Sequence, residues 1–172
     1  MKTRQEDGFT LVELLIVVAI IGIVASIGVA QVMRARVAAN ESSAISSMRT
    51  VNTAQVSYAN SAANGGYATS LVILATPCPG GTGFISPDLD PSLPSATVAG
   101  TGIVKSGYNV DLVAAGVGST TDCNGTLAMT DYVATAVPRT VGATGERGFN
   151  TNSAGTIFFD PAGLPTGTTP IQ

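Results

Sequence analysis

The chain of 172 residues contains no histidine and no tryptophan, and only 11% of its residues are charged. Without histidine it can form neither a Ser-His-Asp nor a Cys-His catalytic site, and it can form no metal site with imidazole ligands. Catalysis by aspartate or lysine stays formally open, but no group of reactive side chains points to it. We therefore expect no enzyme, no bound metal and no cofactor.

Positive charge is also scarce. Eight Lys and Arg residues stand against eleven Asp and Glu residues, which gives a net charge of −3. A protein that binds nucleic acid needs clustered Lys or Arg residues to neutralise phosphates. We expect no direct binding of nucleic acid by this chain.

One hydrophobic run dominates the first part of the sequence. Residues 14–33 carry no charge at all, and about 20 such residues are what an α-helix needs to cross a bilayer. No small-residue cleavage site follows the run, so we do not expect its removal as a secretory signal. Basic residues flank the run on both sides, so charge alone does not set its orientation.

Glu13 stands directly before this run. An ionised side chain in a membrane-spanning helix is costly, so such a carboxylate is expected to be functional and to have a cationic partner. The positions one helical turn away hold Phe9 and Val17, neither of which is a cation. We expect the partner of Glu13 to be another molecule.

Two cysteines occur, Cys78 and Cys123, and both lie beyond the hydrophobic run. A pair of cysteines in a part of the chain that leaves the cytoplasm favours one structural disulfide. They are 45 positions apart, and closing so long a loop stabilises a fold by roughly 3–4 kcal/mol in the chain-entropy model. The alternative is a pair of buried free thiols.

Residues 8–13 (GFTLVE), with the short polar leader before them and the apolar run after them, resemble the amino-terminal signature of type IV pilins and type II secretion pseudopilins. The resemblance implies that a prepilin peptidase cuts after Gly8 and methylates the new amino group of Phe9. It also implies that Glu13 pairs with the positively charged amino terminus of a neighbouring subunit. Ala30 departs from the pattern, because many pilins have proline there and a proline would kink the helix.

Helical character continues past the membrane run, since residues 34–63 contain no proline and no glycine and are rich in alanine. Spacings of three, four and seven predict an apolar stripe, formed by Val37, Ala44, Ile45, Met48, Val51 and Tyr58. The predicted opposite side carries Asn40, Ser43, Ser47, Arg49 and Asn60. Asn64-Gly65-Gly66 is a stop signal. We predict one helix over residues 9–63, the alternative being two helices with a break near Gly28.

The remaining sequence predicts a small β-rich head. A helical turn capped by Ser70 is expected within residues 67–75, and the Pro- and Gly-rich residues 76–107 predict irregular loop. Strand patterns follow at residues 108–113 and 132–137, and then a hairpin over residues 148–159. Three or four antiparallel strands cannot bury a core alone, so they need the long helix. The predicted fold class is α+β, with a long N-terminal helix packed against a small antiparallel sheet, as in pilins.

The predicted organisation is a leader at residues 1–8, a membrane half of the helix at 9–33, an amphipathic half at 34–64, and a head at 65–172. Asp88 and Asp90 stand two apart in a loop, but they lack the glycine and glutamate of an EF-hand and predict a solvated turn rather than a calcium site. Asn124-Gly125-Thr126 fits a glycosylation pattern, and we interpret it as a turn.

The resemblance predicts a structural subunit of a type IV pilus, for adhesion, motility or uptake. Its partners would be further copies of itself, the prepilin peptidase, an assembly ATPase and an inner-membrane platform protein. It would lie in the bacterial inner membrane and then in a surface filament. One alternative is a pseudopilin in a periplasmic filament of a type II secretion system. A second is a bitopic membrane protein whose periplasmic head binds a ligand.

Overall fold

The computed structural model describes residues 8–171, with the backbone alone for residues 27–30. Residues 1–7 of the predicted leader, residues 1–8, lie outside the described residues. The chain divides into two compact units, Met1–Arg36 and Val37–Gln172, which are described separately below.

Helix α1 (Leu11–Ser61) comprises 51 residues. Its backbone is helical without interruption, including residues 27–30, so the predicted single helix is found and the alternative break near Gly28 is not. The helix ends at the predicted stop signal. Asn64 and Gly65 have φ angles of 47° and 92°, and the N–H of Gly65 donates to the carbonyl of Ala59 at 2.8 Å. A positive φ at this point is the usual way to close a helix.

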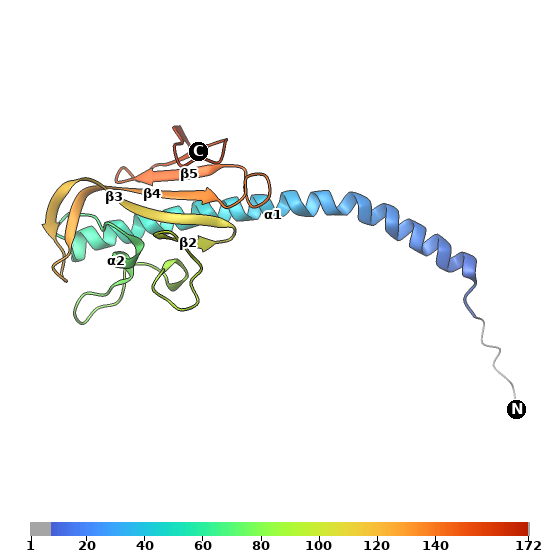
Figure 1. Ribbon diagram of the computed structural model, residues 1–172, viewed down its shortest axis with the longest axis horizontal. Coiled ribbons are helices and arrows are strands. Elements are labelled where there is room, and N and C mark those ends of the chain that lie inside the picture. The colour runs from blue at the N-terminus through green and yellow to red at the C-terminus, as the bar shows by residue number, and fades with distance from the viewer. Residues whose placement is uncertain (1–7, 172) are drawn as a thin grey trace, which may run out of the picture. The chain divides into compact units, whose positions relative to one another are not determined.

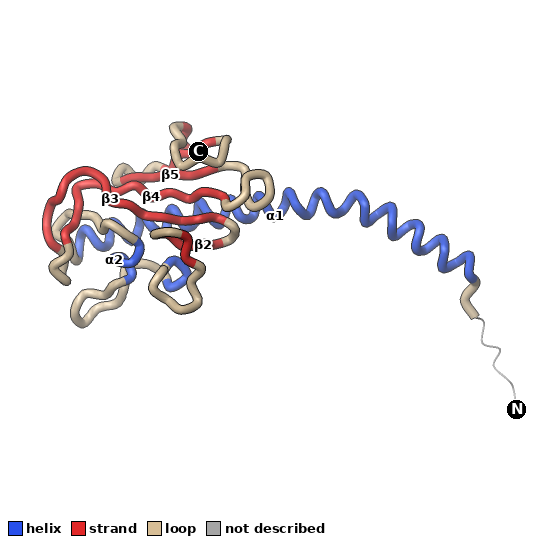
Figure 2. The backbone as a smooth tube through the Cα atoms, in the orientation of Figure 1, coloured by secondary structure: helices blue, strands red, loops and turns tan. Residues whose placement is uncertain are grey.

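The head contains one antiparallel sheet of seven strands, which lie side by side in the order of the chain (Figures 1 and 2). The strands are β1 (Val98–Ala99), β2 (Gly102–Lys105), β3 (Tyr108–Thr121), β4 (Leu127–Pro138), β5 (Gly148–Asn152), β6 (Ile157–Asp160) and β7 (Thr169–Pro170). Two short helical pieces precede the sheet, α2 (Leu71–Ala75) and η1 (Pro87–Leu89). The two edge strands, β1 and β7, are only two residues long.

The core lies between the sheet and the part of α1 that belongs to the second unit. From α1, Met48, Val51 and Tyr58 are almost fully buried. Alternate residues of the central strands β3 and β4 cover them: Tyr108, Val110, Leu112, Tyr132, Ala134 and Ala136. The fold class is therefore α+β, a long N-terminal helix packed with an antiparallel sheet, which is a pilin-like architecture.

The head differs from the sequence prediction in its short elements. The segment predicted as loop, residues 76–107, contains η1, β1 and β2, and the prediction also missed β7. Strands of two to four residues are too short to show an alternating pattern, and only pairing with their neighbours defines them. By contrast, the capped turn is present as α2, where the Ser70 hydroxyl accepts a hydrogen bond from Ile73 N.

One residue of the helix prediction was placed on the wrong side. Ser47 was assigned to the polar side of α1, but only 1% of its surface is exposed. Its hydroxyl donates to the carbonyl of Ser43 at 3.0 Å, so no polar donor is left unpaired by its burial. Serine can therefore stand within a buried stripe that a simple polar-apolar pattern would exclude.

Candidate functional site

Thr10 and Glu13 form a reciprocal cap at the start of α1. The hydroxyl and the backbone N–H of Thr10 both donate to Glu13 Oε2, at 2.7 Å and 3.0 Å. In return, the N–H of Glu13 donates to the Thr10 hydroxyl oxygen at 3.3 Å. This is a capping box, in which two backbone N–H groups at a helix start are satisfied by side chains.

The sequence predicts a partner for Glu13 in another molecule, whereas the structure shows Thr10 of the same chain as one partner. The pattern Thr-x-x-Glu before an apolar run was the signal that could have identified this contact. Thr10 is the partner in all three hydrogen bonds that the carboxylate and the backbone N–H of Glu13 form. Within the carboxylate, Oε2 alone accepts hydrogen bonds from Thr10. Among the described residues, Oε1 accepts no hydrogen bond and is open to a further partner.

The helix that follows Glu13 exposes its apolar side chains on every side. Phe9 is 84% exposed, and the large apolar residues from position 11 to 24 are all exposed: Leu11, Val12, Leu14, Leu15, Ile16, Val17, Val18, Ile20, Ile21, Ile23 and Val24. By length and composition alone, α1 can cross a membrane. So large an apolar surface needs lipid or other helices around it.

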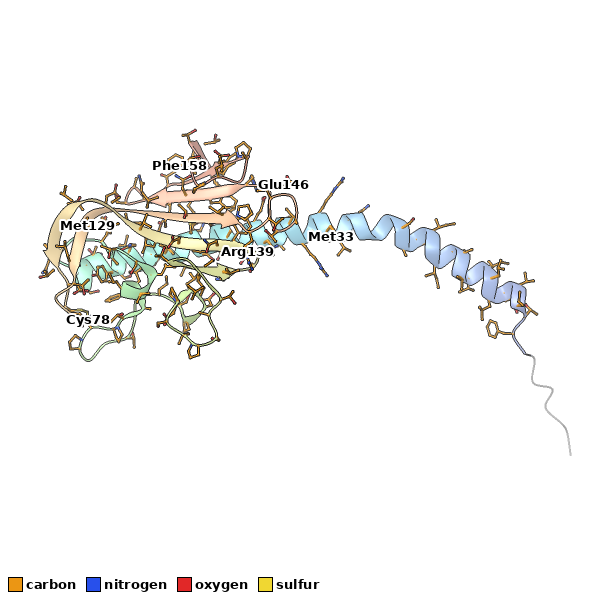
Figure 3. All side chains as sticks on the ribbon, in the orientation of Figure 1. Met33, Cys78, Met129, Arg139, Glu146 and Phe158 are labelled. Carbon is orange, nitrogen blue, oxygen red and sulfur yellow. A yellow bond between two sulfur atoms is a disulfide. The ribbon has the colours of Figure 1, made fainter. Side chains whose placement is uncertain are left out.

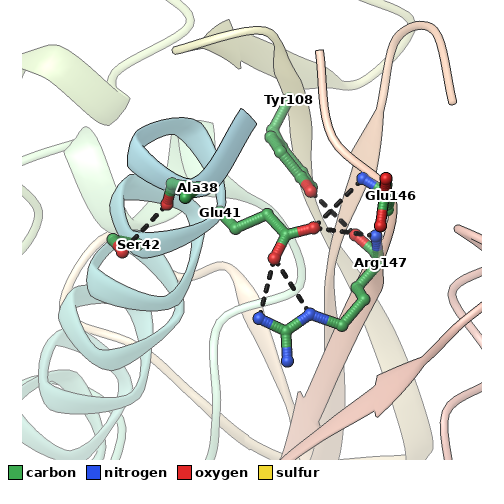
Figure 4. A network of polar contacts seen from close by, with 6 residues as sticks. All are labelled: Ala38, Glu41, Ser42, Tyr108, Glu146 and Arg147. Carbon is green, nitrogen blue, oxygen red and sulfur yellow. Dashed lines mark hydrogen bonds and ion pairs between the residues drawn. The ribbon is translucent and has the colours of Figure 1, made fainter. Parts of the chain in front are cut away.

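In the head, the carboxylate of Glu41 joins α1 to the segment before β5 (Figure 4). Glu41 Oε1 accepts from the backbone N–H groups of Glu146 and Arg147 at 3.0 and 3.1 Å. Its Oε2 accepts from Arg147 Nε and Nη2 at 2.9 and 2.7 Å. The hydroxyl of Tyr108 donates to the Arg147 carbonyl at 2.8 Å. Four charge-assisted hydrogen bonds thus fix this loop to the helix.

The environment of Glu41 also sets its ionisation. Burial alone would raise the pKa of Glu41, but the hydrogen bonds from Arg147 and from the backbone N–H groups outweigh it and hold the pKa below its usual value. Burial, together with the Glu41 charge, raises the pKa of Tyr108 above its usual range. The cluster is therefore a carboxylate that stays ionised beside a phenol that stays neutral.

Further along α1, two amide side chains, one buried and one half-buried, perform similar tasks. Gln55 is fully buried and pairs with both backbone groups of Ala68, each at 2.9 Å. Asn52 donates to Thr151 at 3.0 Å and accepts from the hydroxyl of Tyr132 at 2.9 Å. None of these three polar anchors, Glu41, Asn52 and Gln55, is predicted from the sequence. The partners of Glu41 and Asn52 lie about 100 positions away, and the partner of Gln55 lies 13 positions away, beyond the end of the helix.

Cys78 and Cys123 are joined in a disulfide with a Cα–Cα distance of 5.6 Å. The turn that holds Cys123 is fixed by Asp122, which accepts from the N–H groups of Asn124 and Thr126. The hydroxyl of Tyr58 on α1 donates to Asp122 at 2.9 Å. These contacts hold residues 124–126 in a turn.

The two aspartates that had been considered for calcium each have their own protein partner. Asp88 forms an ion pair with Lys105, and Asp90 accepts from the N–H and hydroxyl of Ser92. Within the described part of the chain, no group of three His, Cys, Asp or Glu side chains could hold a metal ion. Asp88 therefore lies in η1 and is held by β2, and Asp90 caps the residues that follow it.

An exposed apolar helix with a capped start and a small disulfide-bonded head together form a pilin-like architecture. Residues 3–29 match the family model described as the prokaryotic N-terminal methylation motif, so the chain carries the signature of type IV pilins and pseudopilins. No curated protein and no solved structure matches the chain. The match includes Gly8, Phe9 and Glu13. It supports a pilin-like or pseudopilin protein.

Proposed function

We propose that this chain is the structural subunit of a type IV pilus. In this proposal the bond between Gly8 and Phe9 is cut by a prepilin peptidase, the new amino group of Phe9 is methylated, and the mature chains polymerise through the first part of α1. The observation that carries the proposal is the methylation motif over residues 3–29, together with the exposed large apolar side chains of α1 between Leu11 and Val24.

The arrangement at Glu13 supplies a physical reason for linking cleavage to assembly. Glu13 Oε2 is occupied by Thr10 of the same chain, whereas Oε1 is open among the described residues. Cleavage after Gly8 creates a cationic amino group at Phe9 that the precursor lacks. In an apolar surrounding, that cation and the open oxygen of a neighbouring Glu13 would attract each other strongly, because little solvent screens them.

The partners and the location follow from the same motif. Its match implies processing by a prepilin peptidase and assembly by pilus machinery, for which we propose a motor ATPase and a platform protein of the inner membrane. The motif and the apolar helix are consistent with insertion into a membrane, followed by a filament at the surface or in the periplasm. We propose the surface filament, and a short periplasmic filament would instead identify a pseudopilin.

Mass spectrometry of the chain purified from its native membrane or filaments tests the proposal. We expect the mature chain to begin at Phe9 and to carry one methyl group on its amino nitrogen. A chain that still begins at Met1 would contradict both the pilus and the pseudopilin, and would favour a bitopic membrane protein. Electron microscopy of surface filaments, with a mutant lacking this chain as control, then separates a pilus from a secretion filament.

A further inference from the structure

The part of α1 that belongs to the head has a second stripe, which the sheet leaves uncovered. Its members recur at spacings of four and three and are all exposed: Ser42, Ser46, Arg49, Thr53, Val56 and Asn60. At about 3.6 residues per turn, the stripe lies on the side of α1 opposite the buried one that includes Met48 and Val51. Among the described residues, no other element covers it.

Two hydroxyls of this uncovered stripe can lose water at little cost. The hydroxyl of Ser42 donates to the carbonyl of Ala38 (Figure 4), and the hydroxyl of Thr53 donates to that of Arg49, each at 3.0 Å. Because these donors are satisfied within the helix, a neighbour could cover them without leaving buried donors unpaired. Arg49 is different, since a guanidinium has five donors and no acceptor.

Arg49 lies between two grooves on the surface of the head. One groove, of about 310 Å³, lies between α1 and Phe84, and the other, also of about 310 Å³, is lined by Thr156, Ile157 and Ile171. Within the described residues, the Arg49 side chain makes no ion pair and no hydrogen bond. It is an exposed cation in a hollowed surface, without an anion of its own chain.

Glu146 is its counterpart among the acids of the head. It is exposed in the segment between β4 and β5 (Figure 3), and its carboxylate accepts no hydrogen bond from any described residue. The other acids of the head all have partners in their own chain: Glu41, Asp88, Asp90, Asp111, Asp122, Asp131 and Asp160. Glu146 is thus the described head acid that remains available to another molecule.

The two groups lie at different levels of the same helix. The N–H of Glu146 donates to Glu41 at 3.0 Å, which places Glu146 beside a helix position eight residues before Arg49. At 1.5 Å per residue, the two levels differ by about 12 Å. A second copy that is parallel to the first and shifted by this distance along the helix brings its Glu146 level with Arg49.

We propose that the uncovered stripe of α1 binds a second copy of this chain, with Arg49 of one copy paired to Glu146 of the next. The contact joins two different surfaces, so each subunit has one of each kind, and such a contact repeats along a filament instead of closing into a pair. This inference rests on the proposed function, because it takes the partner to be a neighbour in the filament.

Crosslinking within filaments tests the pairing. In a chain that carries both Arg49→Cys and Glu146→Cys, mild oxidation of sheared filaments should link each subunit to the next and give a ladder on a non-reducing gel. The matched control combines Arg49→Cys with Val117→Cys, which replaces a side chain that is 68% exposed on β3. That control should remain monomeric. If filaments of the first variant form normally but give no ladder, the pairing is overturned. A product limited to dimers overturns it as well.

Charge reversal provides an independent readout and separates this inference from the proposed function. Arg49→Glu and Glu146→Arg should each lose most filaments because like charges then face each other, and the double variant should recover them. Both side chains are exposed, so unfolding temperatures should match the wild type. Filaments unchanged in the Arg49→Glu variant would overturn the pairing alone. A wild-type chain that is methylated at Phe9 but never forms filaments would overturn the proposed function and the pairing together.

Discussion

Glu13 and Glu41 are carboxylates of the same helix, and their hydrogen bonds give them different capacities. Glu13 uses one oxygen, toward Thr10, whereas Glu41 uses both oxygens in four hydrogen bonds. An oxygen without a donor can accept a partner from outside, and a fully occupied carboxylate can only hold what it already binds. Glu13 is therefore suited to assembly and Glu41 to stability.

The stability role of Glu41 gives a prediction with a pH dependence. Glu41→Gln should lower the free energy of unfolding by about 2–3 kcal/mol at neutral pH, since hydrogen bonds to a charged group are lost. The pKa of Glu41 is lowered in the folded chain, so its contribution is complete above the ordinary pKa of about 4.3 and disappears as the pH falls through the folded value. Thermal unfolding of the full chain in detergent at several pH values measures this.

Glu146→Gln is the matched control, because that carboxylate is exposed and has no described partner. It should leave the unfolding temperature unchanged. The wild type and the Glu41→Gln variant should converge as the pH falls. Asp88 and Asp131, whose pKa values are also lowered by hydrogen bonds, would still give both chains some acid sensitivity. A constant gap between the two chains down to low pH would contradict the assigned role.

The role of a single residue could be predicted only where the evidence for it lay in the neighbouring sequence. Glu13 could be identified because its own neighbours in the sequence make it costly. Glu41 could not, because Arg147 lies 106 positions away and only the folded head brings them together. Thr10 was an intermediate case, with a short pattern that was present but not used.

At the scale of elements, length and regularity decided what the sequence could predict. Helix α1 and the central strands β3 and β4 were anticipated, because long stripes and alternations repeat a signal many times. The ends of β3 and β4 extend beyond the predicted 108–113 and 132–137, through a hairpin with irregular register. These extensions, and the two-residue strands, depend on pairing across the sheet rather than on any pattern of their own.

The disulfide is the covalent element of the head, and its removal tests how much that loop contributes. It joins the segment after α2 to the turn between β3 and β4, across 45 positions. Replacing both cysteines, Cys78→Ser with Cys123→Ser, should lower the free energy of unfolding by roughly 3–4 kcal/mol. Chemical denaturation of the oxidised wild type and of the double variant measures the difference. Reduced wild type should behave like the double variant, and equal midpoints for all three would contradict the prediction.

At the scale of the whole molecule, the two units differ in the surface that they present. The large apolar side chains described in the first unit are all exposed, whereas the second unit has a buried hydrophobic core. A surface of the first kind is stable only in lipid or among other helices. The first unit therefore needs lipid or other helices around it, whereas the head has a hydrophobic core of its own.

This difference predicts separate effects on insertion and assembly. Glu13→Ala should abolish or disorder filaments while leaving membrane insertion intact, because the apolar helix remains and the proposed ionic contact is lost. Thr10→Val separates the capping role of Glu13 from its proposed role in assembly, since the variant removes the capping hydroxyl of residue 10 and keeps the Glu13 carboxylate. Cell fractionation and electron microscopy measure insertion and filaments. Normal filaments from Glu13→Ala would remove this carboxylate from the mechanism.

The short edge strands carry a consequence for crowding. Heads held side by side in a polymer meet at very high local concentration, a condition in which open strand edges fuse into cross-β aggregates. Here each edge offers two residues, and one of the residues of β7 is Pro170, which has no N–H to donate. Neighbouring heads can therefore touch and separate again without extending each other's sheet, which would allow such a polymer to be taken apart as well as built.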